Sequence, residues 1–190
     1  MPAWGADRTI VVIGDSLSSG YGLDAGQSWV ALLEAHLDEQ AYGYEVVNAS
    51  IAGDTSAGGL ARLPALLAAH EPAVVVIELG GNDGLRGQPV AKLKENLARM
   101  IELVQTADAL PVLTGIQIPP NYGPAYTESF ARIYQELAGD YGVPLVEFLM
   151  QGVALDPDLM QSDRIHPNAA GQRPMFDNVW IVLSELLEPR

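Results

Sequence analysis

The chain has 190 residues, with 10 lysines and arginines against 24 aspartates and glutamates, and therefore a formal net charge of −14. This length predicts a single domain over residues 1–190, in which residues 1–7 are interpreted as a leader remnant or as residues added for expression. The acidic surplus argues against nucleic-acid binding, which needs a basic face. The absence of cysteine excludes a disulfide scaffold, thiol catalysis and cysteine-bound zinc. Because no apolar run reaches the ~20 residues of a membrane span, we expect no stable membrane insertion.

Short apolar runs alternate with segments of helical periodicity along the whole chain. The five predicted strands are Thr9–Ile13, Glu45–Asn48, Val74–Leu79, Pro111–Ile116 and Val143–Val146. Helices are predicted from the Ser28 cap, over Ser56–His70 with a break or a new helix at Pro64, from Pro89, over 126–139 and over 172–187. This order predicts an α/β fold with a parallel sheet that is covered by helices on both faces.

Three predicted strands are followed by loops that could bind a ligand. In a parallel sheet, ligands bind where the carboxyl ends of the strands meet. Ser16 follows the first strand, Gly53 the second and Asn82 the third. Each loop alone would pass for an ordinary turn, but together they place a hydroxyl, a backbone N–H and a side-chain amide at one edge.

One histidine differs from the other two in its setting. His36 and His70 fall on predicted helices, whereas His166 lies in a loop three residues after Asp163. That spacing lets one turn hold the carboxylate against Nδ1 and leaves Nε2 free as a base. A surface turn or half of a metal site has the same spacing, but no further ligands stand nearby, and no metal is expected. With Ser16 as nucleophile, the set predicts a hydrolase site.

Four sequence blocks stand in order within residues 8–187, namely GDSL at Gly14–Leu17, the Gly53 loop, GGND at Gly80–Asp83 and DxxH at Asp163–His166. In these blocks the chain resembles the SGNH (GDSL) hydrolases, in the branch of multifunctional thioesterase I/lysophospholipases and arylesterases. The resemblance implies a three-layer α/β/α sandwich around a mainly parallel, five-stranded, flavodoxin-like sheet. It implies Ser16 as nucleophile, His166 as base and Asp163 as acid. It also implies an oxyanion hole formed by the Ser16 N–H, the Gly53 N–H and the Asn82 side chain.

The function implied by this resemblance is that of a cofactor-free serine hydrolase, which cleaves carboxylic esters and thioesters through an acyl-enzyme on Ser16. The loop Ile118–Tyr126 follows a strand and contains three prolines, so we expect it at the same edge as Ser16. Tyr122 and Tyr126 are the predicted substrate-binding residues of this loop. Since the chain has only three Phe and three Trp, a shallow groove for short to medium acyl groups is expected.

Two other functions share much of this evidence. A flavodoxin-like module could use the same loops to bind a small ligand without chemistry, and a carbohydrate-ester deacetylase would have the same catalytic set. Under the leading hypothesis, the protein binds a small-molecule ester or thioester and is a monomer. Because members of this branch are often exported, we expect a periplasmic or secreted enzyme whose leader has been removed. A cytosolic enzyme remains the alternative.

Overall fold

The structure, a computed structural model, describes residues 8–189, so the interpretation of residues 1–7 lies outside the described residues. Five parallel strands form the central sheet in the order β2-β1-β3-β4-β5. Their bounds are Arg8–Gly14 for β1, Tyr44–Asn48 for β2, Val74–Glu78 for β3, Leu110–Thr114 for β4 and Leu145–Val146 for β5. The expected parallel, five-stranded sheet is therefore confirmed, and its strand order is the flavodoxin-like one.

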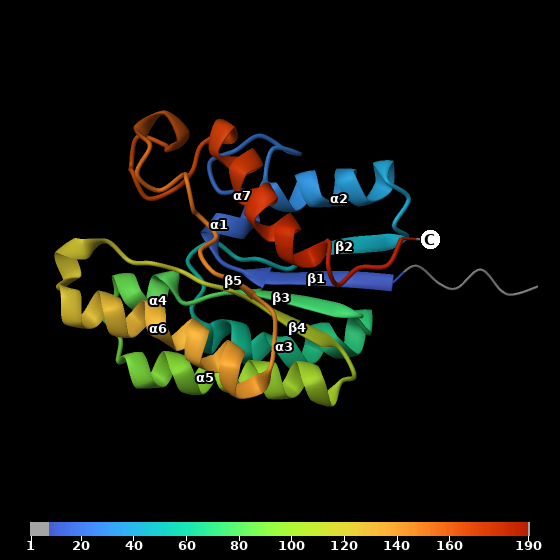
Figure 1. Cartoon of the computed structure of the whole chain (residues 1–190), viewed down its shortest axis with the longest axis horizontal. Coiled ribbons are helices and arrows are strands. Elements are labelled where there is room, and N and C mark those ends of the chain that lie inside the picture. The colour runs from blue at the N-terminus through green and yellow to red at the C-terminus, as the bar shows by residue number, and fades with distance from the viewer. Residues whose placement is uncertain (1–7, 190) are drawn as a thin grey trace, which may run out of the picture.

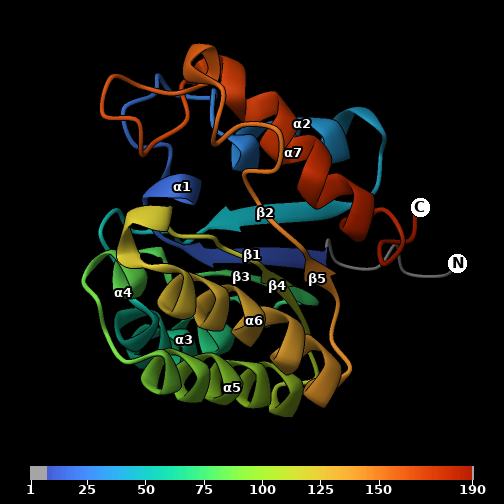
Figure 2. The same ribbon diagram turned by 60° about the vertical axis from the view of Figure 1, so that its left-hand side comes forward.

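Long helices cover both faces of this sheet, which gives three layers (Figures 1 and 2). One face carries α2 (Trp29–Glu39) and α7 (Ala169–Leu183). The other carries α3 (Ser56–His70), α5 (Val90–Thr106) and α6 (Pro124–Tyr141). Four short helical segments complete the described chain: α1 (Ser16–Ser19), α4 (Gly81–Leu85), η1 (Pro120–Tyr122) and η2 (Pro157–Leu159).

The apolar strands are unbroken because both of their faces are buried. In β1, Ile10 and Val12 pack into the cluster under α2 and α7, whereas Val11 and Ile13 pack into the cluster under α3, α5 and α6. Alternate residues of a strand point to opposite faces, so a central strand needs apolar residues at every position.

Several helix bounds differ from the prediction: α6 extends beyond 126–139 at both ends, and α7 ends at Leu183 rather than near 187. No break occurs at Pro64, because α3 runs continuously from Ser56 to His70. Pro64 itself is exposed, while Leu63 beside it is fully buried, and this packing offsets the lost hydrogen bond of an internal proline. The last helix starts at Ala169 rather than near 172, because the Asn168 side chain accepts hydrogen bonds from the Ala170 and Gly171 N–H groups.

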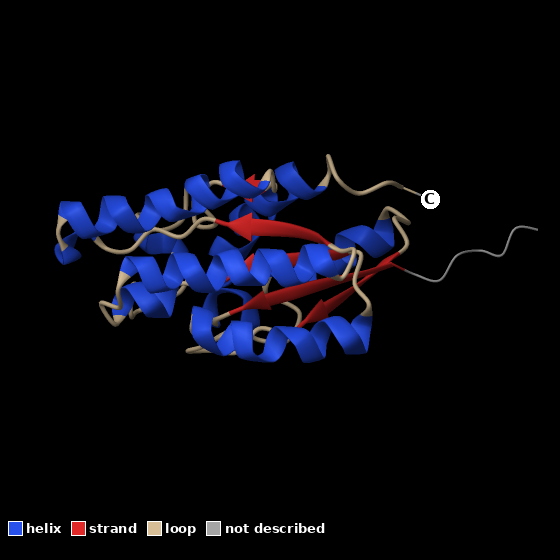
Figure 3. Ribbon diagram, turned by 90° about the horizontal axis from the view of Figure 1, so that it is seen from below, coloured by secondary structure: helices blue, strands red, loops and turns tan. Residues whose placement is uncertain are grey.

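All five strands point toward the same end of the sheet, so the loops that follow them gather at one edge (Figure 3). Ser16, Gly53 and Asn82 all lie beyond this edge, in the connections that follow β1, β2 and β3. Among the helices of the described part, none combines the length and the apolar character that crossing a bilayer would require.

Candidate active site

Ser16 lies at the first position of α1, directly beyond the end of β1. Asp15 caps this short helix, since its Oδ1 accepts a hydrogen bond from the Leu17 N–H at 3.0 Å. The helix begins immediately after a buried strand, which turns the chain sharply and leaves Ser16 half-buried beside a cavity.

Asp163 and His166 lie in a loop that closes on itself before α7. Met160 and Pro167 form an antiparallel bridge, and the Gln161 N–H donates to the His166 carbonyl at 2.7 Å. The Gln161 side chain also donates to the Tyr21 carbonyl at 2.9 Å, which ties this loop to the segment after α1. The turn is thereby held against the part of the chain that carries Ser16.

The three predicted catalytic side chains form a continuous hydrogen-bonded chain. Nε2 of His166 lies 2.9 Å from Oγ of Ser16, and Nδ1 of His166 lies 2.7 Å from Oδ2 of Asp163. Desolvation raises the pKa of Asp163, but hydrogen bonds from the His166 ring and from the His166 and Ile165 N–H groups outweigh it and lower this pKa to about 2. Asp163 is therefore ionised at neutral pH and can hold the imidazole with Nδ1 protonated.

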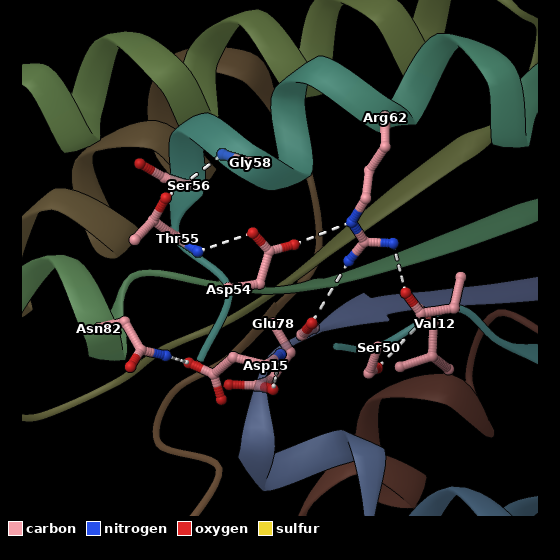
Figure 4. A network of polar contacts seen from close by, with 12 residues as sticks. Val12, Asp15, Ser50, Asp54, Thr55, Ser56, Gly58, Arg62, Glu78 and Asn82 are labelled. Atoms are coloured by element: carbon pink, nitrogen blue, oxygen red, sulfur yellow. Dashed lines mark hydrogen bonds and ion pairs between the residues drawn. The ribbon is translucent and has the colours of Figure 1, made fainter. Parts of the chain in front are cut away.

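Gly53 lies in the loop between β2 and α3, with φ +81°. A left-handed backbone of this kind favours glycine. The Gly53 carbonyl accepts a hydrogen bond from Arg86 at 3.0 Å, and its N–H has no partner among the described residues. On the other side of the loop, Arg62 of α3 contacts Asp54 (Figure 4). Its guanidinium also donates to the backbone carbonyls of Ala49 and Gly14.

Asn82 lies in the first turn of α4, beyond the end of β3. Its Nδ2 donates to Oδ2 of Asp15 at 3.0 Å, so the amide is held beside the residue that precedes Ser16 (Figure 4). The following residue, Asp83, fixes α4 to the start of α3, because its carboxylate accepts from the N–H of Ser56 at 2.9 Å and from its Oγ at 2.5 Å.

A cavity of about 480 Å³ opens beside Ser16, Asn82 and His166. Most of its wall is apolar, and the apolar lining residues are Leu17, Leu85, Ile116, Ile118, Pro119, Pro120, Phe148, Met150, Ala154, Leu155, Met160 and Ile165. A second cavity of about 520 Å³ shares part of this lining, around the loop 150–157. Such a wall suits an apolar substrate group.

The two predicted substrate-binding tyrosines do not line this cavity. The Tyr122 hydroxyl donates to the Leu85 carbonyl, and the Tyr126 hydroxyl donates to the Gln88 carbonyl, each at 2.8 Å. The two tyrosines therefore hold η1 and the first turn of α6 against the end of α4 and the residues that follow it. Of the predicted loop Ile118–Tyr126, only its first three residues reach the cavity.

Three side chains beside the site were not predicted from the sequence to have a role there: Asp15, Arg62 and Glu78. Of these three, Glu78 could have been noticed in the sequence, because it is the one charged residue at the end of an otherwise apolar strand, Val74–Glu78. Its burial could not be predicted, because it depends on the elements that pack around it. In the described residues, no group of three His, Asp or Glu side chains is placed to hold a metal ion.

A flavodoxin-like sheet with a Ser–His–Asp chain at its carboxyl edge defines a class of α/β serine hydrolases. The chain belongs to the GDSL-like lipase/acylhydrolase family, which it matches over residues 12–173.

Individual relatives agree with this assignment. The chain is 54% identical over 182 residues to "Esterase TesA" of Pseudomonas aeruginosa, which covers 96% of this chain and 90% of that protein. It is 49% identical over 167 residues to "Thioesterase 1/protease 1/lysophospholipase L1" of Escherichia coli strain K12, covering 88% of this chain and 79% of that protein. The crystal structure of the psychrotrophic esterase EstA from Pseudoalteromonas sp. superposes with a TM-score of 0.90 at 42% identity, covering 95% of this chain and 98% of that one.

The family and these relatives identify the chain as an enzyme, a GDSL-type hydrolase of carboxylic esters and thioesters. Small-molecule esters and thioesters are the substrates that fit this family. The expected function is thereby confirmed, and the alternative of a ligand-binding module without chemistry is not supported.

Proposed function

We propose that Ser16, His166 and Asp163 are the catalytic residues and that hydrolysis runs through an acyl-enzyme on Ser16. The observation that carries this proposal is the hydrogen-bonded chain from Ser16 Oγ through both ring nitrogens of His166 to Asp163. Distances of 2.9 and 2.7 Å let His166 take the serine proton while the carboxylate stabilises the imidazolium that forms.

In the first half-reaction, Ser16 Oγ bonds to the carbonyl carbon of the substrate and its proton passes to Nε2 of His166. The carbonyl oxygen becomes an oxyanion. When this tetrahedral intermediate collapses, the bond to the alcohol or thiol breaks, and His166 returns the proton to that leaving group. In the second half-reaction, water gives a proton to His166 and its oxygen bonds to the acyl carbon. The bond between this carbon and Ser16 Oγ then breaks, the acid is released, and His166 returns the proton to Oγ.

The oxyanion is proposed to be held by three donors: the Ser16 N–H, the Gly53 N–H and Nδ2 of Asn82. In the described chain neither the Ser16 N–H nor the Gly53 N–H has a protein partner, so both can serve a ligand. Donors that stand ready before the reaction stabilise the charge that develops in the transition state without the cost of reorganisation.

The acyl group is proposed to lie in the 480 Å³ cavity, along the wall formed by residues 116–120 and Leu85. Each buried CH₂ group contributes about 0.8 kcal/mol while the wall continues. A cavity of this size supports the expected preference for short to medium acyl chains. Tyr122 and Tyr126 are proposed to act from behind this wall, through the hydrogen bonds that hold the loop.

The oligomeric state and the cellular location of the enzyme are also proposed. One chain supplies every group of the site, which supports activity as a monomer. Size-exclusion chromatography at the concentration of the assay tests this proposal. The resemblance of the chain to exported members of its branch supports a periplasmic or secreted location. Fractionation of the native cells tests this second proposal, because activity confined to the cytosol would contradict it.

The decisive experiment compares the wild type with the Ser16→Ala variant. The hydrolysis of an activated ester and the covalent labelling by a phosphonate ester are measured for both proteins. EstA, the relative described above, was crystallised as an enzyme inhibited by monoethylphosphonate. We expect a loss of about 10⁴–10⁶-fold in kcat, as for other triad nucleophiles, with one phosphonate bound per wild-type chain and none per variant chain. Residual turnover within about tenfold of the wild type would mean that another group attacks.

A further inference from the structure

Two carboxyl groups without a role in the reaction above lie buried beside the proposed oxyanion hole. Asp15 is 2% exposed and Glu78 is fully buried. Asp15 immediately precedes Ser16, and Glu78 is the last residue of β3, which pairs with the end of β1 at Gly14. The two carboxyl groups therefore lie where two neighbouring central strands end, beneath both Ser16 and Asn82.

Glu78 holds the turn that carries Ser16. Its Oε2 accepts a hydrogen bond from the Ser18 hydroxyl at 2.7 Å and from the Asp15 N–H at 3.2 Å. A Cβ atom on Gly14 would lie only 2.6 Å from this oxygen, so the carboxyl group lies directly against the backbone of β1. Glu78 thus accepts hydrogen bonds from residues on both sides of Ser16 in the sequence, Asp15 and Ser18. Its Oε1 has no hydrogen-bond partner among the described residues.

Asp15 contacts the side-chain amide of Asn82. Oδ1 of Asp15 accepts from the Leu17 N–H, and Oδ2 accepts from Nδ2 of Asn82 at 3.0 Å. An ionised carboxylate can only accept hydrogen bonds, so it must face the NH₂ end of an amide and not its oxygen. The second N–H of Asn82 then stays available to a ligand. The reversed amide would present a carbonyl oxygen to the oxyanion.

We propose that Asp15 and Glu78 are positioning residues of the oxyanion hole. Asp15 fixes the orientation of the Asn82 amide, and Glu78 fixes the turn from which Asp15 reaches it. This inference rests on the function proposed for Asn82, because the buried pair orients the Asn82 N–H that is proposed to bind the oxyanion.

The protonation of the pair follows from its burial. Desolvation raises the pKa of Asp15 to about 6, and desolvation together with the charge of Asp15 raises the pKa of Glu78 well above its usual range. Asp15 is therefore mostly ionised at pH 7, and Glu78 holds its proton to a higher pH than an exposed glutamate does. The other charged groups around Asp15 are His166, which lowers its pKa, and Asp54, which raises it and is itself paired with Arg62.

This protonation state makes the orientation of Asn82 depend on pH. As the pH falls through about 6, Asp15 gains a proton and becomes able to donate a hydrogen bond as well. A protonated Asp15 can accept from the NH₂ group of Asn82 or donate its O–H to the Asn82 carbonyl oxygen, so it contacts either end of the amide. The preference for the productive orientation is then lost.

The first test replaces the carboxylate by the amide of the same shape, Asp15→Asn. We expect kcat at pH 7 to fall about 10- to 100-fold with KM changed less than about twofold, which is less than the loss of a whole oxyanion donor. Because the ionised Asp15 carboxylate is buried at a cost, Tm at the same pH should rise. The matched control is Asp38→Asn, an exposed aspartate of α2, which should leave kcat, KM and Tm unchanged. An unchanged kcat, or a fall of kcat together with Tm, would overturn the proposal.

The second test observes Asn82 directly and needs no turnover. In ¹⁵N-labelled protein, the side-chain amide resonances of Asn82, assigned from their absence in Asn82→Ala, should titrate with a midpoint near pH 6. The titration should vanish in Asp15→Asn and persist in Glu78→Gln, where an amide of the same shape replaces the acid and Asp15 is unchanged. If it persists in Asp15→Asn, the amide responds to a group other than Asp15 and the proposal is wrong. An active Ser16→Ala variant, by contrast, would overturn the proposed function and leave this titration unaffected.

Discussion

Nε of Arg62 lies 2.8 Å from Oδ2 of Asp54, and the same guanidinium reaches two backbone carbonyls at the ends of neighbouring strands (Figure 4). These carbonyls belong to Gly14, two residues before Ser16, and to Ala49, in the loop that carries Gly53. The guanidinium donates in several fixed directions within one plane, which suits a contact with three segments. Arg62 therefore joins the turn of the proposed nucleophile to the loop of a proposed oxyanion donor.

Replacing Arg62 by alanine should loosen that loop. We expect kcat to fall about tenfold with little change in KM, which is less than the full loss of an oxyanion donor, because Gly53 keeps its N–H. Stability should fall by about 1–3 kcal/mol, since a partly buried carboxylate and two carbonyls lose their donor. Added guanidinium at millimolar concentration should restore part of kcat. Arg99→Ala, which breaks an exposed pair with Glu102, is the control and should change neither quantity. A wild-type kcat in Arg62→Ala would contradict this role.

Removal of the Asn82 amide should affect the transition state more than substrate binding. For Asn82→Ala we expect kcat to fall roughly 10²–10³-fold with KM nearly constant. Asn82→Asp should be as harmful or worse, because it places an acceptor beside Asp15 and beside the developing charge. Steady-state kinetics with one activated ester measure both constants. If KM alone moved, Asn82 would bind the substrate rather than stabilise the oxyanion.

A pair of variants separates the cavity wall from the loop behind it. Leu85→Ala removes apolar surface from the cavity, so kcat/KM for a medium-chain ester should fall about 3- to 10-fold more than for an acetate ester, at about 0.8 kcal/mol for each CH₂ that loses its contact. Tyr122→Ala removes the hydrogen bond to the Leu85 carbonyl and no part of the cavity wall, so it should lower both activities to a similar extent. An ester series of increasing acyl length measures the difference. A larger effect of Tyr122→Ala on esters with long acyl chains would mean that Tyr122 contacts the acyl chain of the substrate.

The buried carboxyl of Asp15 should make stability depend on pH in a defined window. Its pKa in the folded state is about 6, against 3.8 for an ordinary aspartate, because burial disfavours the charged form. Between these values the unfolded chain holds fewer protons than the folded one, so this group lowers stability as the pH rises from about 4 to about 6, by roughly 2–3 kcal/mol.

Denaturant unfolding of the wild type and Asp15→Asn across this range measures the effect. The variant should be the more stable protein above pH 6, and the gap should close as the pH falls toward 4. A gap that stays constant over the whole range would show that Asp15 keeps one protonation state throughout it.

Much of the architecture follows from local patterns in the sequence. The unbroken apolar runs of β1 and β3 predict strands that are buried on both faces, and the alternation with helical segments predicts a parallel sheet. Parallel strands bring their carboxyl ends together, which places Ser16, Gly53 and Asn82 at one edge without knowledge of any contact. The Asp163–His166 pair is also local, since three residues of one turn suffice to join them.

The remaining features depend on contacts between segments that are far apart in the chain. Pro64 stays inside a continuous helix because α3 packs against α5, although its local preference is to end one. Tyr122 and Tyr126 turn their hydroxyls toward backbone carbonyls of another segment, which no spacing within their own loop reveals. Ser16 and His166 are 150 residues apart and meet only because the loop before α7 is bonded to the segment after α1.

The sequence by itself determined which residue types stand at the carboxyl ends of the strands, because strand periodicity and turn chemistry act over a few neighbouring residues. Only the tertiary structure decided the environment of those residues. Burial, and with it the raised pKa values of Asp15 and Glu78, depends on which elements cover a group and exclude water from it. The groups that contact the two carboxyls come from β1, α1 and α4, so this environment exists only when the chain has folded.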